Sequence, residues 1–304
     1  MAMVSLNRFL VLAVIFGFLT LGTYGIGRVY FKLTDGFGPS AIAVGSTDKY
    51  WAIAPLTPEQ EDLIHSLLAQ KYTYMAKGTQ SYVLNSNDDE FVLKFFKKKH
   101  LDFPQWQKVL IGFPLVGASF AETERRREDK RERIFSGCKL AYQSMQQDSG
   151  IVYIHLNVSD DLPASMTIVD KLGIEHHINP NDYSFYIQRK GIAVYPALKR
   201  FKAEGDVQGA AEALDKLFKY MVQRSQRGIL DRDPNYINNV GFLNEEAATL
   251  DVGNVTFDPL IRNPREYARR IVDHTQAIRR WIDTNFSELL PAYEQSVAAL
   301  NQGE

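Results

Sequence analysis

The sequence predicts an α+β protein in which antiparallel strands with one inserted helix precede a mainly helical region, behind an N-terminal membrane-spanning helix. Three observations predict this fold: an uncharged apolar run over residues 9–26, strand-like runs between residues 72 and 191, and helical periodicity from about residue 206. The chain has 304 residues, of which 45% are hydrophobic and 23% charged. This composition is typical of a folded protein and excludes a disordered chain.

Charge balance and cysteine content exclude two classes of protein. The chain carries 35 Lys and Arg against 36 Asp and Glu, which leaves a formal net charge of −1. Proteins that bind nucleic acid through its phosphates usually have a clear basic excess, so we expect no nucleic-acid partner. The single cysteine, Cys138, excludes an internal disulfide framework and any multi-cysteine metal site, and we interpret it as a core residue.

The N-terminal residues 9–26 (FLVLAVIFGFLTLGTYGI) contain no charged side chain. A helix of this length spans about 27 Å, at the short end of what a bilayer core requires. We expect residues 1–30 to form a single uncleaved anchor, with the folded domain on the cytosolic side of the membrane. A cleaved signal peptide is the alternative, but residues 23–25 (Thr-Tyr-Gly) match a cleavage site poorly. With a cleaved signal the chain would be an extracytoplasmic binding module.

The elements after the anchor follow from local signals. Residues 31–56 are rich in Gly, Ser, Thr and Pro and predict a linker. Thr57 followed by Pro58 predicts the start of a helix that ends near Lys71. Strands are expected over 72–84, 90–96, 150–158, 166–173, 176–179 and 184–191, and helices over 122–147, 206–227 and from about 263.

The segment between the second strand and the helix over 122–147 has two features of its own. We interpret residues 97–100 (Lys-Lys-Lys-His) as side chains that are exposed to solvent. The alternative is that they bind anionic lipid headgroups. Residues 100–120 are irregular and apolar. The long insertion therefore separates the strands that precede it from the helix that follows.

Residues 228–253 contain the candidate catalytic and metal-binding side chains. Asp233 follows a long helix, Asn238 comes five positions later, and an expected β-hairpin over 240–250 ends on Asp251. Two carboxylates and a carboxamide supply the oxygen atoms that Mg²⁺ prefers as ligands. Phosphoryl transfer requires such a set, with one carboxylate near the acceptor hydroxyl and further oxygens to hold Mg²⁺ against the phosphates.

Residues 231–238 (Asp-Arg-Asp-x-x-x-x-Asn) and 251–253 (Asp-Val-Gly) resemble the catalytic loop and the metal-binding motif of the protein-kinase-like superfamily, H-R-D-x-x-x-x-N and D-F-G. The chain departs from these motifs at three positions. Asp231 stands where the superfamily generally has His, Val252 where it often has Phe, and Asn235 where protein kinases have Lys. These departures point to an atypical or small-molecule-type kinase, or to a pseudokinase.

The N-terminal half carries the other parts of the resemblance, which covers about residues 72–258. Residues 76–83 resemble a Gly-rich loop with one glycine retained, and Phe91-Val92-Leu93-Lys94 resembles V-A-I-K. The resemblance implies that Gly78 and Ser81 cover the nucleotide phosphates, that Lys94 contacts them, and that Glu132 positions Lys94. Glu128, one helical turn earlier, is the runner-up for the last role. Residues 188–194 would contact the adenine through their backbone.

The resemblance implies a bilobal kinase-like fold over 57–304, with an N-lobe over about 57–190 and a reduced C-lobe over about 191–304. ATP and Mg²⁺ are the implied cofactors, with Asn238 and Asp251 holding the metal ion. Asp233 would orient or deprotonate the hydroxyl of the acceptor, which is a protein or a small molecule. The alternative is a catalytically weak pseudokinase or scaffold that binds a protein partner at the membrane.

Overall fold

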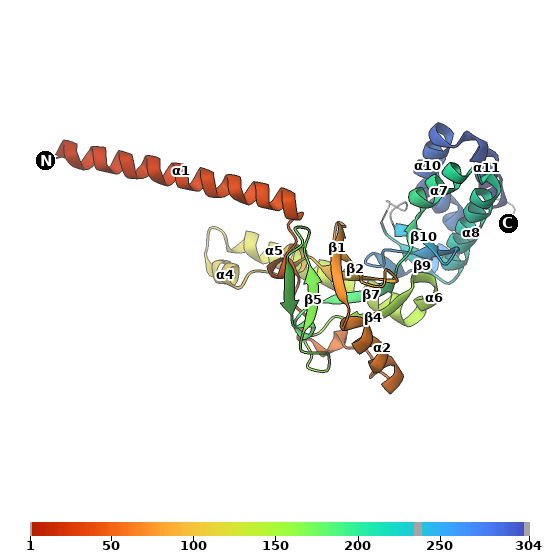
Figure 1. Cartoon of the computed structure of the whole chain (residues 1–304), viewed down its shortest axis with the longest axis horizontal. Coiled ribbons are helices and arrows are strands. Elements are labelled where there is room, and N and C mark those ends of the chain that lie inside the picture. Colours follow the sequence, from red (N-terminus) through yellow and green to blue (C-terminus); the bar gives the residue numbers. More distant parts are fainter. Residues whose placement is uncertain (1, 234–238, 301–304) are drawn as a thin grey trace.

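The computed structural model describes residues 2–233 and 239–300. Helix α1 (Ala2–Thr34) leaves the folded part as a single long helix (Figure 1). Within it, Val14–Thr34 is long and apolar enough to cross a membrane, and apart from the buried Thr34 at its end this segment is not buried against the rest of the chain. The apolar helix expected from the sequence is therefore present as a candidate membrane span.

A seven-stranded sheet forms the centre of the first half, with the strand order β4-β7-β3-β2-β1-β5-β6. Neighbouring strands are antiparallel except β1 and β5, which are parallel. A turn at Gly78 divides the run expected over 72–84 into β1 and β2. The strands are β1 Lys71–Lys77, β2 Ser81–Ser86, β3 Phe91–Phe96, β4 Ile151–His155, β5 Met166–Val169, β6 Glu175–Ile178 and β7 Phe185–Arg189.

Residues that precede the sheet in the chain pack against it. Helix α2 (Pro58–Leu68) begins as expected, with a capping box in which Thr57 and Gln60 each bond the backbone of the other. The segment 35–56, expected to be a linker, has buried apolar side chains and includes the short 3₁₀ helices η1 (Pro39–Ala41) and η2 (Lys49–Trp51). Its buried apolar residues are Phe37, Ile42, Ala43 and Trp51.

Helix α5 (Gly117–Ser144) is the inserted helix, five residues longer at its N-terminus than the sequence predicts. Its buried stripe of Ile134, Phe135, Cys138 and Ala141 follows helical spacing. The stripe belongs to a core cluster that also contains sheet residues and residues 252–255 of the second half. Helix α5 therefore touches both regions that supply the candidate site. Short helices α3 (Lys98–Leu101), α4 (Gln105–Lys108), η3 (Val109–Gly112) and α6 (Gln146–Ser149) flank it.

The second half is mainly helical, as expected, with two small sheets at its junction with the first (Figure 1). One sheet has the order β11-β10-β8 and the other pairs β12 with β9. The strands are β8 Ile192–Ala193, β9 Ile229–Asp231, β10 Val240–Leu243, β11 Glu246–Thr249 and β12 Val255–Phe257. The helices are α7 Val194–Glu204, α8 Val207–Gln226, α10 Pro264–Asn285 and α11 Leu290–Leu300, with the 3₁₀ turns η5 Pro259–Arg262 and η6 Ser287–Leu289; η4 (Pro180–Asp182) precedes β7. A separate apolar core holds these helices together.

Candidate functional site

Pairing of two short strands brings the two motifs of the second half together. Val255 of β12 pairs with Asp231 of β9, and the backbone N–H of Arg232 donates to the carbonyl of Asn254 at 3.1 Å. The strand pair therefore places residues 231–233 beside residues 251–255. The expected hairpin, β10 and β11, ends at Thr249, two residues before Asp251.

Asp231 organises the turn that leads to Asp233. Its buried carboxylate accepts the backbone N–H of Asp233 at 2.9 Å and the Nδ2 of Asn239 at 3.4 Å. Burial raises the pKa of Asp231, while the positive charge of the buried Arg224 on α8 acts in the opposite direction. The residue that stands where the superfamily has His is thus a buried acceptor that shapes the loop. Sequence reasoning did not assign this role to Asp231 or Arg224.

Lys94 lies beside the Asp251 segment. Its Nζ donates to the carbonyl of Leu250 at 2.6 Å, across 156 residues of chain, and lies 5.4 Å from the ring centroid of Tyr186. Burial lowers the pKa of Lys94, whereas the carboxylate of Asp251 favours its charged form. The amino group of Lys94 therefore lies in a largely desolvated place, near enough to Asp251 to be influenced by its charge.

Glu132, which the sequence assigns to Lys94, is exposed on the surface of α5. Among the described residues no ion pair joins it to Lys94; the α5 residue that lies near Lys94 is Cys138. Glu132 lies six residues before Cys138, and at about 100° per residue the two side chains point about 120° apart around the helix. The buried stripe fixes which face of α5 meets Lys94, and Glu132 is on another face. Glu128, the runner-up, is exposed as well.

The turn between β1 and β2 reaches the same segment. Gly78 donates its N–H to the carbonyl of Ser81 at 2.9 Å, closing a tight turn, and Ser81 is buried. At the tip of the turn, the Nε2 of Gln80 donates to the Oδ1 of Asn254 at 3.3 Å. The Nδ2 of Asn254 in turn donates to a carboxylate oxygen of Asp233 at 3.4 Å. A chain of polar contacts therefore runs from the turn to Asp233.

Gln80 and Asn254 were not assigned from the sequence. Asn254 directly follows the Asp-Val-Gly triplet, and this position is the sequence feature that could have identified it as a site residue. The Oε1 of Gln80 is buried and accepts no hydrogen bond from the described residues. It lies close to Gly253, where an added Cβ would be only 2.6 Å from that oxygen. The two residues thus extend the candidate site from Asp251 to the turn.

Asn238, the metal site and the adenine-contacting segment are the remaining predictions from the sequence. Asn238 lies outside the described residues. Within the described part of the chain, no group of three or more His, Cys, Asp or Glu side chains could hold a metal ion. In the expected adenine-contacting segment, Gln188 is buried and donates to the carbonyl of Ser149 at 2.6 Å, and β8 pairs with β10.

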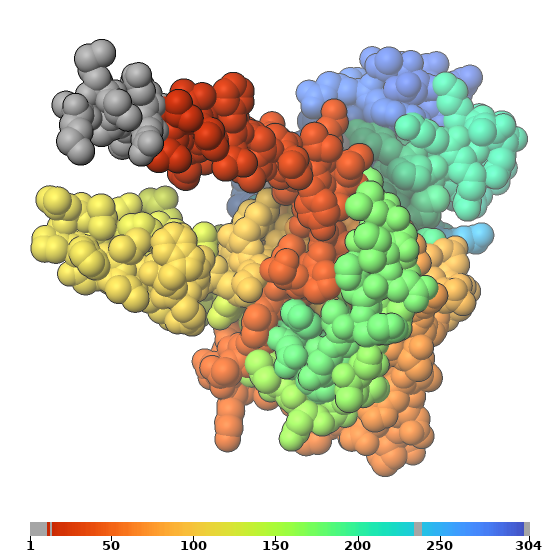
Figure 2. Space-filling model, turned by 60° about the vertical axis from the view of Figure 1, so that its left-hand side comes forward, coloured from red at the N-terminus to blue at the C-terminus, as the bar shows by residue number. Residues whose placement is uncertain are grey.

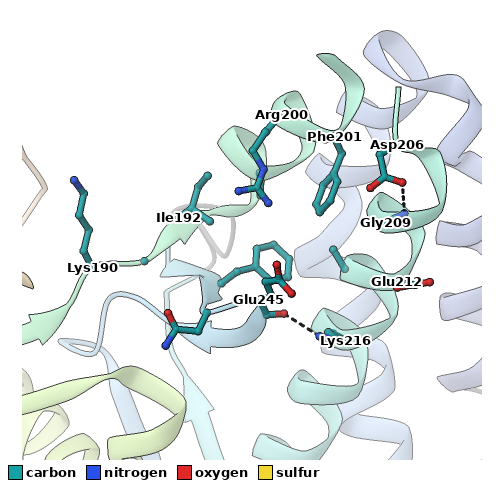
Figure 3. Close-up of a pocket in the computed structure, with 14 residues that line it drawn as sticks. Lys190, Ile192, Arg200, Phe201, Asp206, Gly209, Glu212, Lys216 and Glu245 are labelled. Atoms are coloured by element: carbon teal, nitrogen blue, oxygen red, sulfur yellow. Dashed lines mark hydrogen bonds between the residues drawn. The ribbon is translucent and has the colours of Figure 1, made fainter. Parts of the chain in front are cut away.

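A cavity of about 570 Å³ lies beside this segment (Figure 3). Its walls come from Lys190 to Ile192, from α7 and α8, and from the β10–β11 turn. Phe201 and Phe242 give it apolar surface, and Arg200, Glu212 and Lys216 give it charge. None of Lys94, Asp233 and Asp251 lines it, so the cavity is separate from the polar contacts described above.

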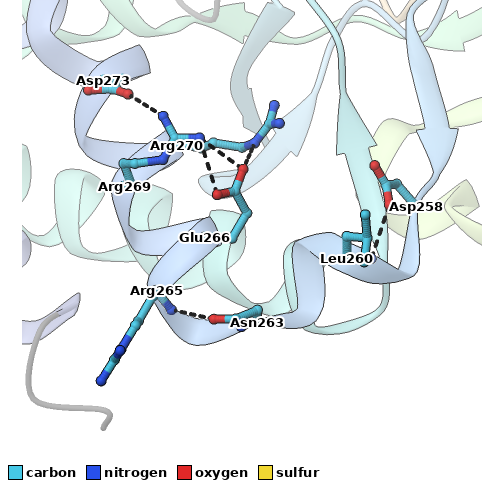
Figure 4. Close-up of polar contacts among 8 residues, drawn as sticks. All are labelled: Asp258, Leu260, Asn263, Arg265, Glu266, Arg269, Arg270 and Asp273. Atoms are coloured by element: carbon cyan, nitrogen blue, oxygen red, sulfur yellow. Dashed lines mark hydrogen bonds and ion pairs between the residues drawn. The ribbon is translucent and has the colours of Figure 1, made fainter.

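A second polar cluster, at the start of α10, is structural (Figure 4). Asn263 caps α10 by accepting the N–H of Arg265 at 3.0 Å. Glu266 accepts from Arg269 and Arg270 at 2.9 and 2.6 Å, which are ordinary spacings of three and four residues along a helix. These contacts are explained by the capping and surface pairing of one helix.

No protein-family model matches the chain, and no curated protein matches it. Among solved structures, it is similar to the bifunctional kinase-methyltransferase WbdD, with 15% identity, a TM-score of 0.34, and coverage of 72% of this chain and 43% of that one. The chain thus spans less than half the length of WbdD.

Two further solved structures are similar to it. WaaP in complex with acyl carrier protein has 10% identity, a TM-score of 0.31, and coverage of 79% of this chain and 92% of that one. Rv3197 with erythromycin, from Mycobacterium tuberculosis, has 14% identity, a TM-score of 0.35, and coverage of 88% and 64%. Similarities this low define neither a family nor an activity for this chain.

Proposed function

We propose that the protein is an atypical membrane-anchored kinase-like phosphotransferase that uses ATP and Mg²⁺. The observation that carries this proposal is the convergence of Lys94 from β3, Asp233 after β9 and Asp251 after β11. Phosphoryl transfer needs a minimal set of three groups. These are a cation, a carboxylate near it and a second carboxylate on an adjoining turn. The set is assembled from parts of the chain that are far apart in sequence.

The donor set fits Mg²⁺ and a nucleotide. Asp251 offers a partly exposed carboxylate, and Asn238 would add a carboxamide oxygen, both of the type that Mg²⁺ prefers. The buried Oε1 of Gln80, which accepts no hydrogen bond from the described residues, is a further oxygen beside Gly253. Bound Mg·ATP would supply a transferable phosphoryl group with its charge partly neutralised.

The protein's own groups have distinct roles in this proposal. Lys94 places a positive charge at the phosphates, and the carboxylate of Asp251 favours its charged form, opposite to the larger effect of burial, which lowers the pKa of Lys94. Asp233 receives the proton of the acceptor hydroxyl, while the contacts of its N–H with Asp231 and of its carboxylate with Asn254 hold it in place. Gly78 and Ser81 belong to the turn that covers the phosphates.

In this proposal the domain over 57–304 is bilobal, with lobes over about 57–190 and 191–304 that meet at the candidate site. Helix α1 anchors it with the site on the cytosolic side, where ATP is available. The acceptor is a protein or a small molecule. The largely apolar and mostly exposed segment Val14–Thr34 supports the anchoring part of the proposal.

A pseudokinase or scaffold that binds a protein partner at the membrane is the second candidate. One observation favours it: the Nζ of Lys94 is bonded to the carbonyl of Leu250, and the α5 position that faces it carries Cys138 in place of a carboxylate. Burial raises the pKa of the Cys138 thiol, so this side chain is neutral and supplies no counter-charge.

A nucleotide-binding titration tests the proposal. The full chain in detergent is titrated with ATP and Mg²⁺ while its melting temperature is measured. A ligand at 100 times its Kd stabilises the folded state by about 2.7 kcal/mol, and at this chain length that is a readily measured shift. Lys94→Met should abolish the shift, and Lys199→Met, at an exposed position of α7, should keep it.

The outcomes separate the candidates. Stabilisation that depends on Lys94 supports a nucleotide site in either candidate, and the turnover measurement at the end of the Discussion then distinguishes them. Absence of any shift at millimolar nucleotide contradicts the kinase and any pseudokinase that binds nucleotide. A shift that Lys94→Met leaves unchanged contradicts the placement of the phosphates at Lys94.

A further inference from the structure

The insertion between β3 and α5 carries an apolar tip on the surface. It contains α3, α4 and η3 and protrudes from the domain (Figure 1). Leu115 is 98% exposed and Trp106 is 66% exposed, although both are large apolar side chains. We define the apolar tip as the exposed residues Trp106, Val109, Phe113, Leu115 and Val116. Soluble proteins seldom expose so many large apolar side chains within one short segment unless they bind something.

The base of the insertion is fixed to the domain. Asp102 accepts from Arg131 of α5 at 2.8 Å and from the backbone N–H of Val44 at 3.1 Å. Gly117, the first residue of α5, packs so closely on the insertion that an added Cβ would be 2.1 Å from the carbonyl of Ile111. The tip is thus held at both ends, and its exposure follows from the way the insertion is built.

The apolar tip lies on the side of the domain from which α1 leaves. Figures 1 and 2 both show α1 and the insertion projecting from that side in the same direction. A cavity of about 830 Å³ adjoins the two; it is lined by Phe31 near the end of α1, by Gly36 just after that helix, and by residues of the insertion and α5. A bilayer that receives α1 is therefore on the side to which the tip points.

The composition of the insertion fits the membrane interface. Tryptophan is enriched where the hydrocarbon core meets the headgroups, and tryptophan, phenylalanine and leucine form the apolar face of interfacial segments; Trp106 and Phe113 are both exposed. Lys98 and Lys99 are exposed at the base of the insertion, where they would meet anionic headgroups. Apolar side chains at the tip with cations behind them are the arrangement of interfacial membrane anchors.

We propose that the apolar tip inserts into the interface of the bilayer that α1 spans, as a second, non-spanning membrane contact. The inference rests on the anchoring part of the proposed function and is independent of its phosphoryl-transfer part. Two contacts at separate points would fix the orientation of the domain on the membrane, which a single helix does not do.

Spin labels at three positions test this. The full chain is reconstituted into vesicles of phosphatidylcholine and phosphatidylglycerol, with Leu115→Cys in the tip, Leu19→Cys in α1 and Leu260→Cys in η5. Leu260 is the matched control, because it is an exposed leucine in the second half, where η5 packs against α8 and β9. The native Cys138 is buried, and the unsubstituted chain gives the labelling background.

The readout is the ratio of spin-label collisions with oxygen, which partitions into lipid, to collisions with a water-soluble nickel chelate. We expect the ratio at 115 to be several-fold higher than at 260 and lower than at 19. Equal ratios at 115 and 260 would overturn the inference. A label at 115 that is shielded from both reagents would overturn it too, because a second copy or another protein would then cover the tip.

The label at 19 separates the two proposals. A water-like ratio there overturns the anchor and the interfacial contact together, while nucleotide binding is measured independently. A lipid-like ratio at 19 with a water-like ratio at 115 overturns the interfacial contact alone.

Discussion

Replacement of Gly137 by alanine tests the packing that joins α5 to the candidate site. Gly137 lies in the buried stretch of α5, one residue before Cys138. A Cβ added there would lie 2.6 Å from the carbonyl oxygen of Val252, 3.1 Å from that of Val255 and 3.3 Å from the carbonyl carbon of Gly253. All three are backbone atoms, so none can rotate away, and α5 or the segment 251–255 must move.

The expected magnitude follows from two opposing terms. Overpacking of this kind costs about 1–3 kcal/mol. Alanine is favoured over glycine in a helix interior by about 1 kcal/mol, which offsets part of the cost. The difference is up to about 2 kcal/mol, and at its middle value of about 1 kcal/mol the free energy of unfolding falls enough to lower the melting temperature by about 2–4 °C for a chain of this size.

The assay is thermal unfolding of the full chain in detergent, followed by circular dichroism. Gly78→Ala is the matched control, because Gly78 does not require a positive φ and an added Cβ there would be in ordinary contact, 3.6 Å from the carbonyl of Ser81. We expect this control to melt at or slightly above the wild-type temperature. A Gly137→Ala protein that is as stable as wild type, or one no less stable than the control, would refute the close approach of α5 to residues 252–255.

Two further substitutions test local features. Asn244 and Glu245, between β10 and β11, have φ of 47° and 67°, a region that favours glycine. Glu245→Gly should therefore raise the free energy of unfolding by about 0.5–1 kcal/mol, measured by urea unfolding. An unchanged or lower stability would contradict this. Lys171 and Lys77 lower the pKa of Asp35 from 3.8 to about 2, so its stabilising contribution is present above the unfolded-state pKa and lost as the pH falls toward 2. Asp35→Asn should therefore cost about 1–2 kcal/mol at pH 7 and only a small part of that at pH 2, where about half of the folded-state carboxyl groups are protonated. A cost that is equal at both pH values would exclude the ionic explanation.

Local chemistry made some of the fold predictable from the sequence. The helix after Thr57 begins with a capping box, and the hairpin before Asp251 has turn residues at its centre, so both were expected and both are present. The apolar stretch over 9–26 likewise predicted a helix that extends away from the domain. Each of these signals lies within a few residues of the structure that it specifies.

Features that depend on long-range packing were not predictable in the same way. The face of α5 that meets Lys94 is set by its buried stripe against the sheet and residues 252–255. The sequence pointed to Glu132 because it lies just before the apolar residues Ile134 and Phe135. The polar composition of residues 31–56 predicted a linker, yet Phe37 and Ile42 are buried in the core. The roles assigned to Lys94 and Asp251 stay predictions, although the structure places the two residues together.

ATP turnover by the full chain in vesicles tests the central claim most directly. Release of phosphate from ATP in the presence of Mg²⁺ is compared between wild type, Asp251→Asn and the matched control Asp273→Asn, at an exposed position of α10. If Asp251 acts at the phosphates, Asp251→Asn should lower the rate by about 100-fold or more, and the control should leave it unchanged. Wild-type protein that binds nucleotide without turnover would favour the pseudokinase, and equal turnover by wild type and Asp251→Asn would contradict the assigned site.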